Sequence, residues 1–336
     1  MTIETILLDH GAGGRASQEL IEQVFARHLA NPVLEAMDDA AVVEPPPGRL
    51  AISTDTFVVD PVVFPGGDIG SLAVHGTVND LACRGARPLW LTAGFVLEEG
   101  LEVSLLERIV ESMGRAAQAA GVLVVAGDTK VVGRGQADKV FINTSGVGVI
   151  PEGLELGGHR ARPGDAVLVS GTLGDHGVTI LAQRQGLGLE VPLQSDSAPL
   201  ADLAGELIRA CPGLHTLRDP TRGGLATTLN EIARTSRVSL ELDEQALPID
   251  PAVAGVCELL GLDPLYLANE GKLIVILPAD QADQALALMR RHQRGGQAAL
   301  VGRVGAEHPG RVWLNTAVGG RRILDMLSGE PLPRIC

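Results

Sequence analysis

The chain has 336 residues, of which 45% are hydrophobic and 20% charged, so we expect a folded protein of about two domains rather than a disordered chain. Its 41 acidic residues outnumber the 27 Lys and Arg, which argues against nucleic-acid and anionic-membrane partners. No apolar run approaches the roughly 20 residues of a membrane span, and the four cysteines form no Cys-x-x-Cys pair. These features together predict a cytoplasmic protein.

Apolar periodicity and turn residues predict helices and strands in alternation along the chain. The first half is expected to form helices at residues 17–29, 68–85 and 104–121, and strands at residues 50–53, 122–126 and 140–150. The second half is expected to form strands at residues 167–170, 273–277, 299–304 and 311–314, and helices at residues 199–211, 221–233, 252–260 and 281–292. Asp68 is a predicted N-cap, and Ser104 with Glu107 is a predicted capping box. A turn at residues 162–165 is expected to mark the boundary between two mixed α/β domains.

Aspartates fall at or beside the predicted ends of elements, and several adjoin glycine. The set is Asp39, Asp55, Asp80, Asp128 and Asp219. Carboxylates are hard ligands for Mg²⁺, and a glycine such as Gly127 lets backbone N–H groups approach phosphate oxygens. The alternative is that these residues are ordinary caps and turns. Neither a Walker A motif nor a Gly-x-Gly-x-x-Gly motif occurs in the sequence. A nucleotide site of the P-loop or Rossmann type therefore has no support.

The last seven residues, 330–336, read Glu-Pro-Leu-Pro-Arg-Ile-Cys. Prolines at alternate positions disfavour helix and predict an extended arm with a thiol at its tip. Such a thiol could enter a site on its own protein, and a nearby cation would favour its nucleophilic thiolate form. The alternative is a frayed terminus that happens to end in cysteine. Cys83, Cys211 and Cys257 lie in or beside predicted helices and are interpreted as buried core residues.

Segments from one end of the chain to the other carry a family resemblance. They are residues 9–14, 38–41, 53–61, 64–70, 76–82, 127–132, 218–225, 269–272 and 333–336. Together they resemble the HypE family of hydrogenase maturation proteins, carbamoyl dehydratases of the PurM-like (aminoimidazole ribonucleotide synthetase) superfamily. The terminal Pro-Arg-Ile-Cys separates that family from its superfamily relatives.

The resemblance implies an α+β, two-domain PurM-like fold. Its implied parts are an N-terminal segment and helix at 1–40, an ATP-binding and dimerising sheet domain at 41–155, a sheet-and-helix domain at 156–328, and a tail at 329–336. It further implies a homodimer, with the nucleotide in a cleft that both protomers and both domains form.

The resemblance also implies a reaction and its partners. HypF would transfer a carbamoyl group to Cys336, ATP would drive dehydration of this thiocarboxamide to a thiocyanate, and the cyanide would pass to iron on a HypC–HypD complex for a [NiFe]-hydrogenase. Glu270 would be the general base, and Lys130 would stabilise charge on the carbamoyl oxygen. The residues implied for ATP are Asp39, Asp55, Asn79, Asp80, Gly127, Asp128, Thr129 and Asp219, of which Asp39, Asp55, Asp80 and Asp219 would hold Mg²⁺.

Two alternatives stay open from the sequence. Selenophosphate synthetase, thiamine-monophosphate kinase and aminoimidazole ribonucleotide synthetase would share the aspartates and glycines, but none of them requires a terminal cysteine. A non-catalytic thiol carrier would need the tail alone, and the complete set of acidic residues weighs against it.

Overall fold

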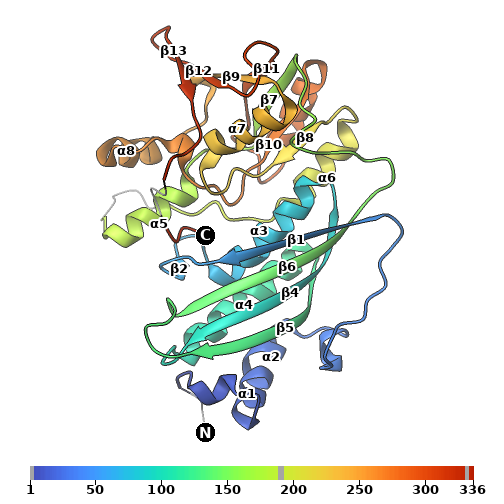
Figure 1. Cartoon of the computed structure of the whole chain (residues 1–336), viewed down its shortest axis with the longest axis vertical. Helices are drawn as coiled ribbons and strands as arrows, with labels where there is room; N and C mark the ends of the chain where they lie inside the picture. Colours follow the sequence, from blue (N-terminus) through green and yellow to red (C-terminus); the bar gives the residue numbers. More distant parts are fainter. Residues whose placement is uncertain (1–3, 188–192, 330–332) are drawn as a thin grey trace.

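The computed structural model describes residues 4–187, 193–329 and 333–336. Two sheets from the two halves of the chain lie one above the other in Figure 1, each with its own helices. This confirms the predicted α+β, two-domain PurM-like fold, while the domain boundaries at residues 40, 155 and 328 stay predictions. In the described part of the chain, no helix has the length and apolar character that crossing a membrane requires.

The first sheet has the strand order β1-β6-β4-β5. Its strands are β1 (Arg49–Phe57), β4 (Arg87–Glu98), β5 (Leu123–Val132) and β6 (Val140–Ile150). All neighbours are antiparallel except β4 and β5, which run parallel. Helices α3 (Ile69–Cys83) and α4 (Val103–Ala120) cover one face, and the other face is turned toward the viewer in Figure 1. A two-stranded hairpin of β2 (Val63–Phe64) and β3 (Gly67–Asp68) leads into α3.

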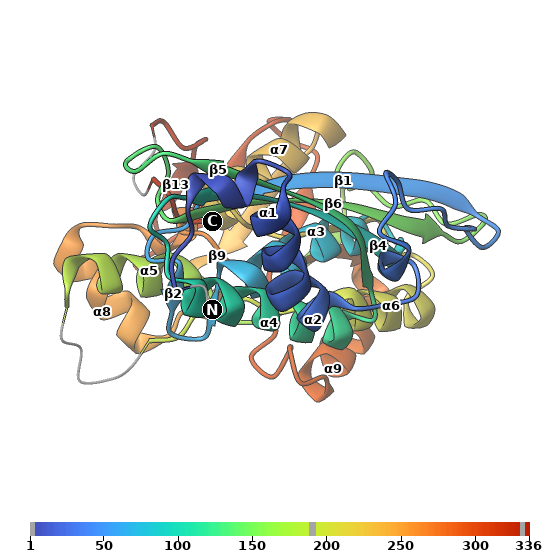
Figure 2. The same ribbon diagram turned by 90° about the horizontal axis from the view of Figure 1, so that it is seen from below.

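A continuous helical segment lies at the β5 edge of this sheet, as Figure 2 shows from below. It consists of α1 (Arg15–Leu20), a π-helical turn (Ile21–Phe25) and α2 (Ala26–Leu29), so the first predicted helix begins two residues earlier than expected. Leu20, Val24 and Phe25 are buried, and the Phe25 ring meets the Phe95 ring edge-on with centroids 4.9 Å apart. The segment therefore belongs to the core of the first domain.

The second sheet has the strand order β13-β12-β9-β11-β7-β10-β8. Its strands are β7 (Asp165–Val169), β8 (Thr216–Arg218), β9 (Ser239–Asp243), β10 (Ile274–Pro278), β11 (Ala299–Gly305), β12 (Val312–Asn315) and β13 (Arg321–Leu324). The accompanying helices are α5 (Asp175–Gln185), α6 (Ala201–Ala210), α7 (Gly224–Ser236), α8 (Pro251–Leu260) and α9 (Ala282–Arg291). Side chains alternate between two cores: Val167 and Ile274 pack with α7, whereas Leu168 and Val275 pack with α6 and α9.

Several local predictions hold and others are wrong. Asp68 caps α3 by accepting hydrogen bonds from two backbone amides, and the three internal cysteines are buried as expected. The capping box is wrong, because Glu102 is the N-cap of α4 and makes no side-chain cap bond. Asp55 and Asp128 lie inside β1 and β5 rather than after a strand, since both strands extend beyond their apolar runs.

The strands and α-helices that the sequence analysis did not predict are β2, β3, β4, α5, β8, β9 and β13. The central strand β4 contains Pro88, which argues against a strand interior, and its ladder shifts register beside that residue. Helix α5 is buried on more than one side, so its apolar residues do not form a single stripe.

Candidate active site

Three of the predicted carboxylates meet where the two domains face each other. Asp55 lies on the side of β1 that faces α3, Asp80 lies in α3, and Asp219 directly follows β8. The Ser53 hydroxyl donates a 2.6 Å hydrogen bond to Asp80 Oδ2. Burial and the charge of Asp80 raise the pKa of Asp55 from 3.8 to about 6 and the pKa of Asp219 from 3.8 to about 7. Asp55 and Asp219 therefore bind a proton more tightly than ordinary aspartates do.

A cavity of about 250 Å³ lies beside this cluster, lined by Ser53, Asp80 and Asp219 and by the glycine pair 157–158. Because like charges raise the pKa of Asp55 and Asp219, a bound cation would relieve the repulsion between them. Among the described residues, no three His, Cys, Asp or Glu side chains lie close enough together to hold a metal ion by themselves. Carboxylate oxygens are the kind of ligand that Mg²⁺ prefers, and Mg²⁺ bound with a nucleotide takes further ligands from water and phosphate oxygens.

The thiol of Cys336 lies against the carboxyl group of Glu270. Glu270 is 2% exposed, and its Oε1 has no hydrogen-bond partner among the described residues. Burial, with the charges of Asp196 and Asp219, raises the pKa of Glu270 well above its ordinary value. Burial and the charge of Glu270 likewise raise the pKa of the Cys336 thiol, and the opposing charge of Arg222 does not reverse this. The docked cysteine is therefore a neutral thiol.

The end of the tail is docked against the loop that follows β1. Val58 N–H donates to the Cys336 carbonyl, and Asp60 N–H donates to the Arg334 carbonyl, both at 3.2 Å. The Arg184 guanidinium at the end of α5 donates to the backbone carbonyls of Asp60 and Arg334. Arg334 has φ 55°, which bends the chain, so the predicted extended arm is wrong for residues 333–336. The alternative of a frayed terminus is also wrong for residues 333–336. Residues 330–332 lie outside the described part of the chain.

A second group of predicted residues lies at the other edge of the first sheet. Asp39, Gly127, Asp128, Thr129 and Lys130 line a cavity of about 320 Å³ between β5 and the helical segment 15–29. Lys130 Nζ lies 2.8 Å from Asp128 Oδ2, and both side chains are mostly exposed. The hydrogen bond from Lys130 lowers the pKa of Asp128.

Within one chain the two groups stay apart. The ladder places Asp55 opposite Thr144, Thr144 opposite Ala93, and Ala93 opposite Gly127. Three strand spacings separate Asp55 from Gly127, which is about 14 Å. A single chain therefore does not bring Lys130 to Cys336 and Glu270.

Asn79 is buried between α3 and the segment before α6. Its amide N–H group donates to the Ala198 carbonyl at 3.0 Å, and its Oδ1 accepts from Leu200 N–H at 2.8 Å. The side chain is 1% exposed, so its polar atoms join α3 to the segment before α6. The predicted nucleotide contact of Asn79 stays a prediction.

Three residues at the site were not singled out from the sequence. Arg222 and Lys272 lie within the family segments 218–225 and 269–272, close in sequence to Asp219 and Glu270, and this proximity could have singled them out. Asp196 lies in a loop where no sequence motif indicated a functional residue. It accepts a hydrogen bond from Glu270 N–H at 3.2 Å.

Comparisons with known proteins cover nearly the whole chain. Residues 37–150 match the family model of the AIR synthase related protein N-terminal domain, and residues 162–315 match that of the C-terminal domain. Carbamoyl dehydratase HypE of Rhodobacter capsulatus is 57% identical over 336 residues, covering 99% of this chain and 98% of that protein. A crystal structure of hydrogenase maturation protein HypE in complex with ATP superposes with a TM-score of 0.96 at 55% identity, over 99% of this chain and 100% of that one. A chain in a crystal structure of a HypE–HypF complex has a TM-score of 0.81 at 47% identity, over 92% and 99%. This chain therefore belongs to the carbamoyl dehydratase HypE family of hydrogenase maturation proteins, among the AIR synthase related proteins.

Proposed function

We propose that the protein dehydrates a carbamoyl group carried on Cys336 to a thiocyanate, with ATP as the driving reactant, and so supplies cyanide ligands to the iron of a [NiFe]-hydrogenase. The observation that carries this proposal is the contact between the terminal thiol and the buried carboxyl of Glu270. A tail used only as a carrier has no need of a buried acid against its thiol. Family membership weighs against the other superfamily reactions, which do not use a terminal cysteine.

The chemistry balances as follows. The carbamoyl oxygen attacks the γ-phosphorus of ATP, a C–O–P linkage forms, ADP leaves, and the nitrogen loses one proton. The second nitrogen proton then leaves, the C–O bond breaks with release of phosphate, and the S–C≡N group remains. Phosphorylation is needed because oxide and hydroxide are poor leaving groups, whereas phosphate is a good one.

Glu270 is the proposed base for the nitrogen protons. Because its pKa is raised, the ionised form of Glu270 is a stronger base than an ordinary carboxylate and takes up a proton more readily. Oε1 could face a substrate nitrogen, since no donor in the described part of the chain bonds to it. Arg222 is placed to offset negative charge that develops near Cys336.

Asp55, Asp80 and Asp219 are proposed to hold Mg²⁺ with the phosphates of ATP, and magnesium would neutralise charge on the transferring phosphoryl group. Asp39, Asp128, Thr129 and Lys130 line a cavity at β5, three strand spacings or about 14 Å from β1 in one chain, and are proposed to contribute to the same reaction from a partner protomer. Leu50 and Ile52 on the open face of β1 are 53% and 75% exposed, as expected for a face that a second copy covers. We therefore propose a homodimer.

The docked thiol implies a cycle of loading and dehydration. Because a neutral, half-buried thiol is a poor nucleophile, Cys336 must leave this position to receive its carbamoyl group. The donor proposed is HypF, the partner in the HypE–HypF complex. The acceptor proposed is a HypC–HypD complex. All four cysteines are free thiols, which suits the reducing cytoplasm that we propose.

Mass spectrometry of the terminal peptide tests the proposal. The protein carbamoylated on Cys336 should lose the mass of one water when Mg²⁺ and ATP are added, with release of phosphate. Glu270→Gln should retain the carbamoyl mass, and Cys336→Ala should carry no modification while still binding ATP. An unchanged peptide mass in the wild-type protein would refute the dehydration.

A further inference from the structure

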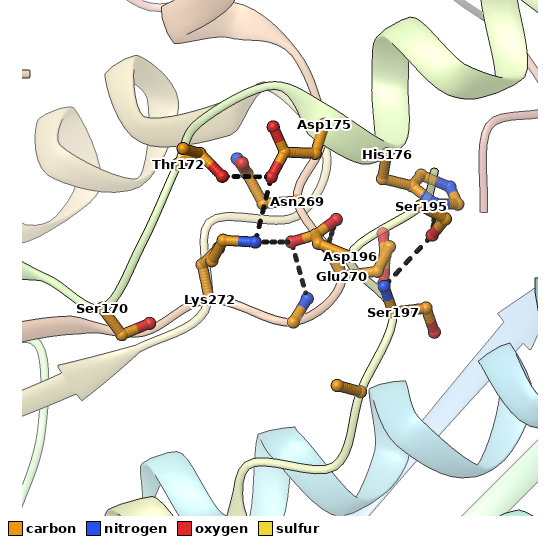
Figure 3. A network of polar contacts seen from close by, with 12 residues as sticks. Ser170, Thr172, Asp175, His176, Ser195, Asp196, Ser197, Asn269, Glu270 and Lys272 are labelled. Atoms are coloured by element: carbon orange, nitrogen blue, oxygen red, sulfur yellow. Dashed lines mark hydrogen bonds and ion pairs between the residues drawn. The ribbon is translucent and has the colours of Figure 1, made fainter. Parts of the chain in front are cut away.

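A short loop, residues 195–197, links the parts of the proposed site. Each of its three residues makes a side-chain contact to a different element, and Figure 3 shows two of these, Ser195 beside His176 and Asp196 paired with Lys272. The Ser195 hydroxyl contacts the His176 ring at 2.7 Å, Asp196 pairs with Lys272 at 3.1 Å, and the Ser197 hydroxyl contacts the His75 ring at 2.9 Å. The loop thereby connects α5, the chain before β10 and α3.

Asp196 fixes the backbone that carries Glu270. Its Oδ1 accepts from Glu270 N–H at 3.2 Å, and its Oδ2 accepts from Gly271 N–H at 3.0 Å. Lys272 Nζ lies 3.1 Å from both Asp196 Oδ2 and Asp175 Oδ2. Burial raises the pKa of Asp196, but the charge of Lys272 and the Glu270 amide bring it below its ordinary value. The ionised Asp196 therefore holds two consecutive amides and sets the direction of the Glu270 side chain.

His176 holds the tail through the same loop. The ring is fully buried, with Nε2 at 2.6 Å from the Ile335 carbonyl and Nδ1 at 2.7 Å from Ser195 Oγ. A carbonyl can only accept, so Nε2 donates, and the neutral ring then accepts at Nδ1 from the Ser195 hydroxyl. Ser195 Oγ in turn accepts from Ser197 N–H at 3.1 Å. Burial lowers the pKa of His176, in keeping with the neutral ring that this chain of bonds requires.

We propose that His176 and Asp196 are positioning residues of the dehydration site: Asp196 fixes Glu270, His176 docks the residue next to Cys336, and loop 195–197 holds both in one frame. The proposal rests on the proposed function for its chemical meaning. Its structural claim is that the hydrogen bond from His176 Nε2 to the Ile335 carbonyl holds the tail where the Cys336 thiol contacts Glu270.

Alkylation of Cys336 by iodoacetamide tests the docking role without any turnover. In His176→Asn the amide reaches only the Nδ1 position, so the Ile335 carbonyl loses its donor, whereas His176→Gln retains an amide nitrogen near the Nε2 position. We expect Cys336 in H176N to be alkylated about tenfold faster than in the wild type, the change that one buried hydrogen bond of about 1.4 kcal/mol produces. H176Q should return most of the way to the wild-type rate. The smaller change Ser195→Ala should act in the same direction if H176N does not fold.

Controls distinguish release of the docked tail from a general destabilisation of the fold. His308→Asn changes an exposed turn histidine and should leave the alkylation rate unchanged. ATP affinity of the folded variants should stay near wild type, because the hydrogen bond to Ile335 does not involve the carboxylate cluster. Equal alkylation rates in wild type, H176N and S195A would overturn the proposal.

A second measurement separates this proposal from the proposed function. In wild-type protein already carbamoylated on Cys336, dehydration should be faster than in carbamoylated H176N, with H176Q between them. If the wild type itself never loses water, the proposed function fails while the alkylation result still decides the docking role. If the wild type dehydrates and H176N dehydrates equally fast, the positioning role is wrong.

Discussion

Asp219→Asn should make the protein more stable, and the gain should depend on pH. Asp219 is 7% exposed, and burial with the charge of Asp80 raises its pKa from 3.8 to about 7. A carboxyl whose pKa is raised on folding binds its proton more tightly in the folded state, so stability is lost as pH rises from about 4 to about 7. At about 1.4 kcal/mol per pH unit, the ionised Asp219 costs about 4 kcal/mol at pH 8 and under about 2 kcal/mol at pH 5. Asparagine has the same shape and no charge, so it removes this cost.

Urea unfolding at pH 5 and pH 8, without Mg²⁺ or ATP, measures the effect. The stability gain of D219N should be about 2 to 3 kcal/mol larger at pH 8 than at pH 5. Asp283→Asn, at an exposed position in α9, is the matched control and should show the same stability difference at both pH values. A D219N protein that is less stable than wild type by equal amounts at both pH values would refute the electrostatic reasoning. The same variant should bind Mg²⁺–ATP more weakly, because the proposed site loses a charge.

Three further outcomes are expected. Gly271→Ala should unfold the site loop or lower the free energy of unfolding by several kcal/mol, because a Cβ there would lie 1.8 Å from the Asp196 carbonyl oxygen. A Cβ at position 255 meets open space, so Gly255→Ala should be neutral or stabilising in the same thermal melt. Asn79→Ala should lower the free energy of unfolding by about 2 to 4 kcal/mol, since it leaves buried backbone groups unpaired, and a change below about 0.5 kcal/mol would contradict that role. Ile52→Lys should shift the proposed dimer toward monomer in analytical ultracentrifugation, whereas a monomeric wild type would end the dimer proposal.

Much of the fold could be predicted from local patterns. Strand β6 has the predicted bounds, α3 has the predicted cap, and α4 ends at Gly121, which adopts φ 68°. These features depend on period, capping chemistry and the tolerance of glycine for positive φ, all of which act over a few residues. Strand β4 was missed because its place at the centre of the sheet outweighs the local effect of Pro88, and that place depends on partners far along the chain.

The sequence by itself determined the chemistry that is available: a terminal thiol, an acidic set that includes Glu270, and the family to which they belong. Only the tertiary structure decided which of these groups meet. It brings Asp55, Asp80 and Asp219 together with Glu270 and Cys336, and leaves Lys130 at the opposite edge of the sheet. The physical reason is that strand pairing and domain packing set distances between residues far apart in the chain. His176 and Asp196 show this most clearly, because each acts through contacts that no local pattern encodes.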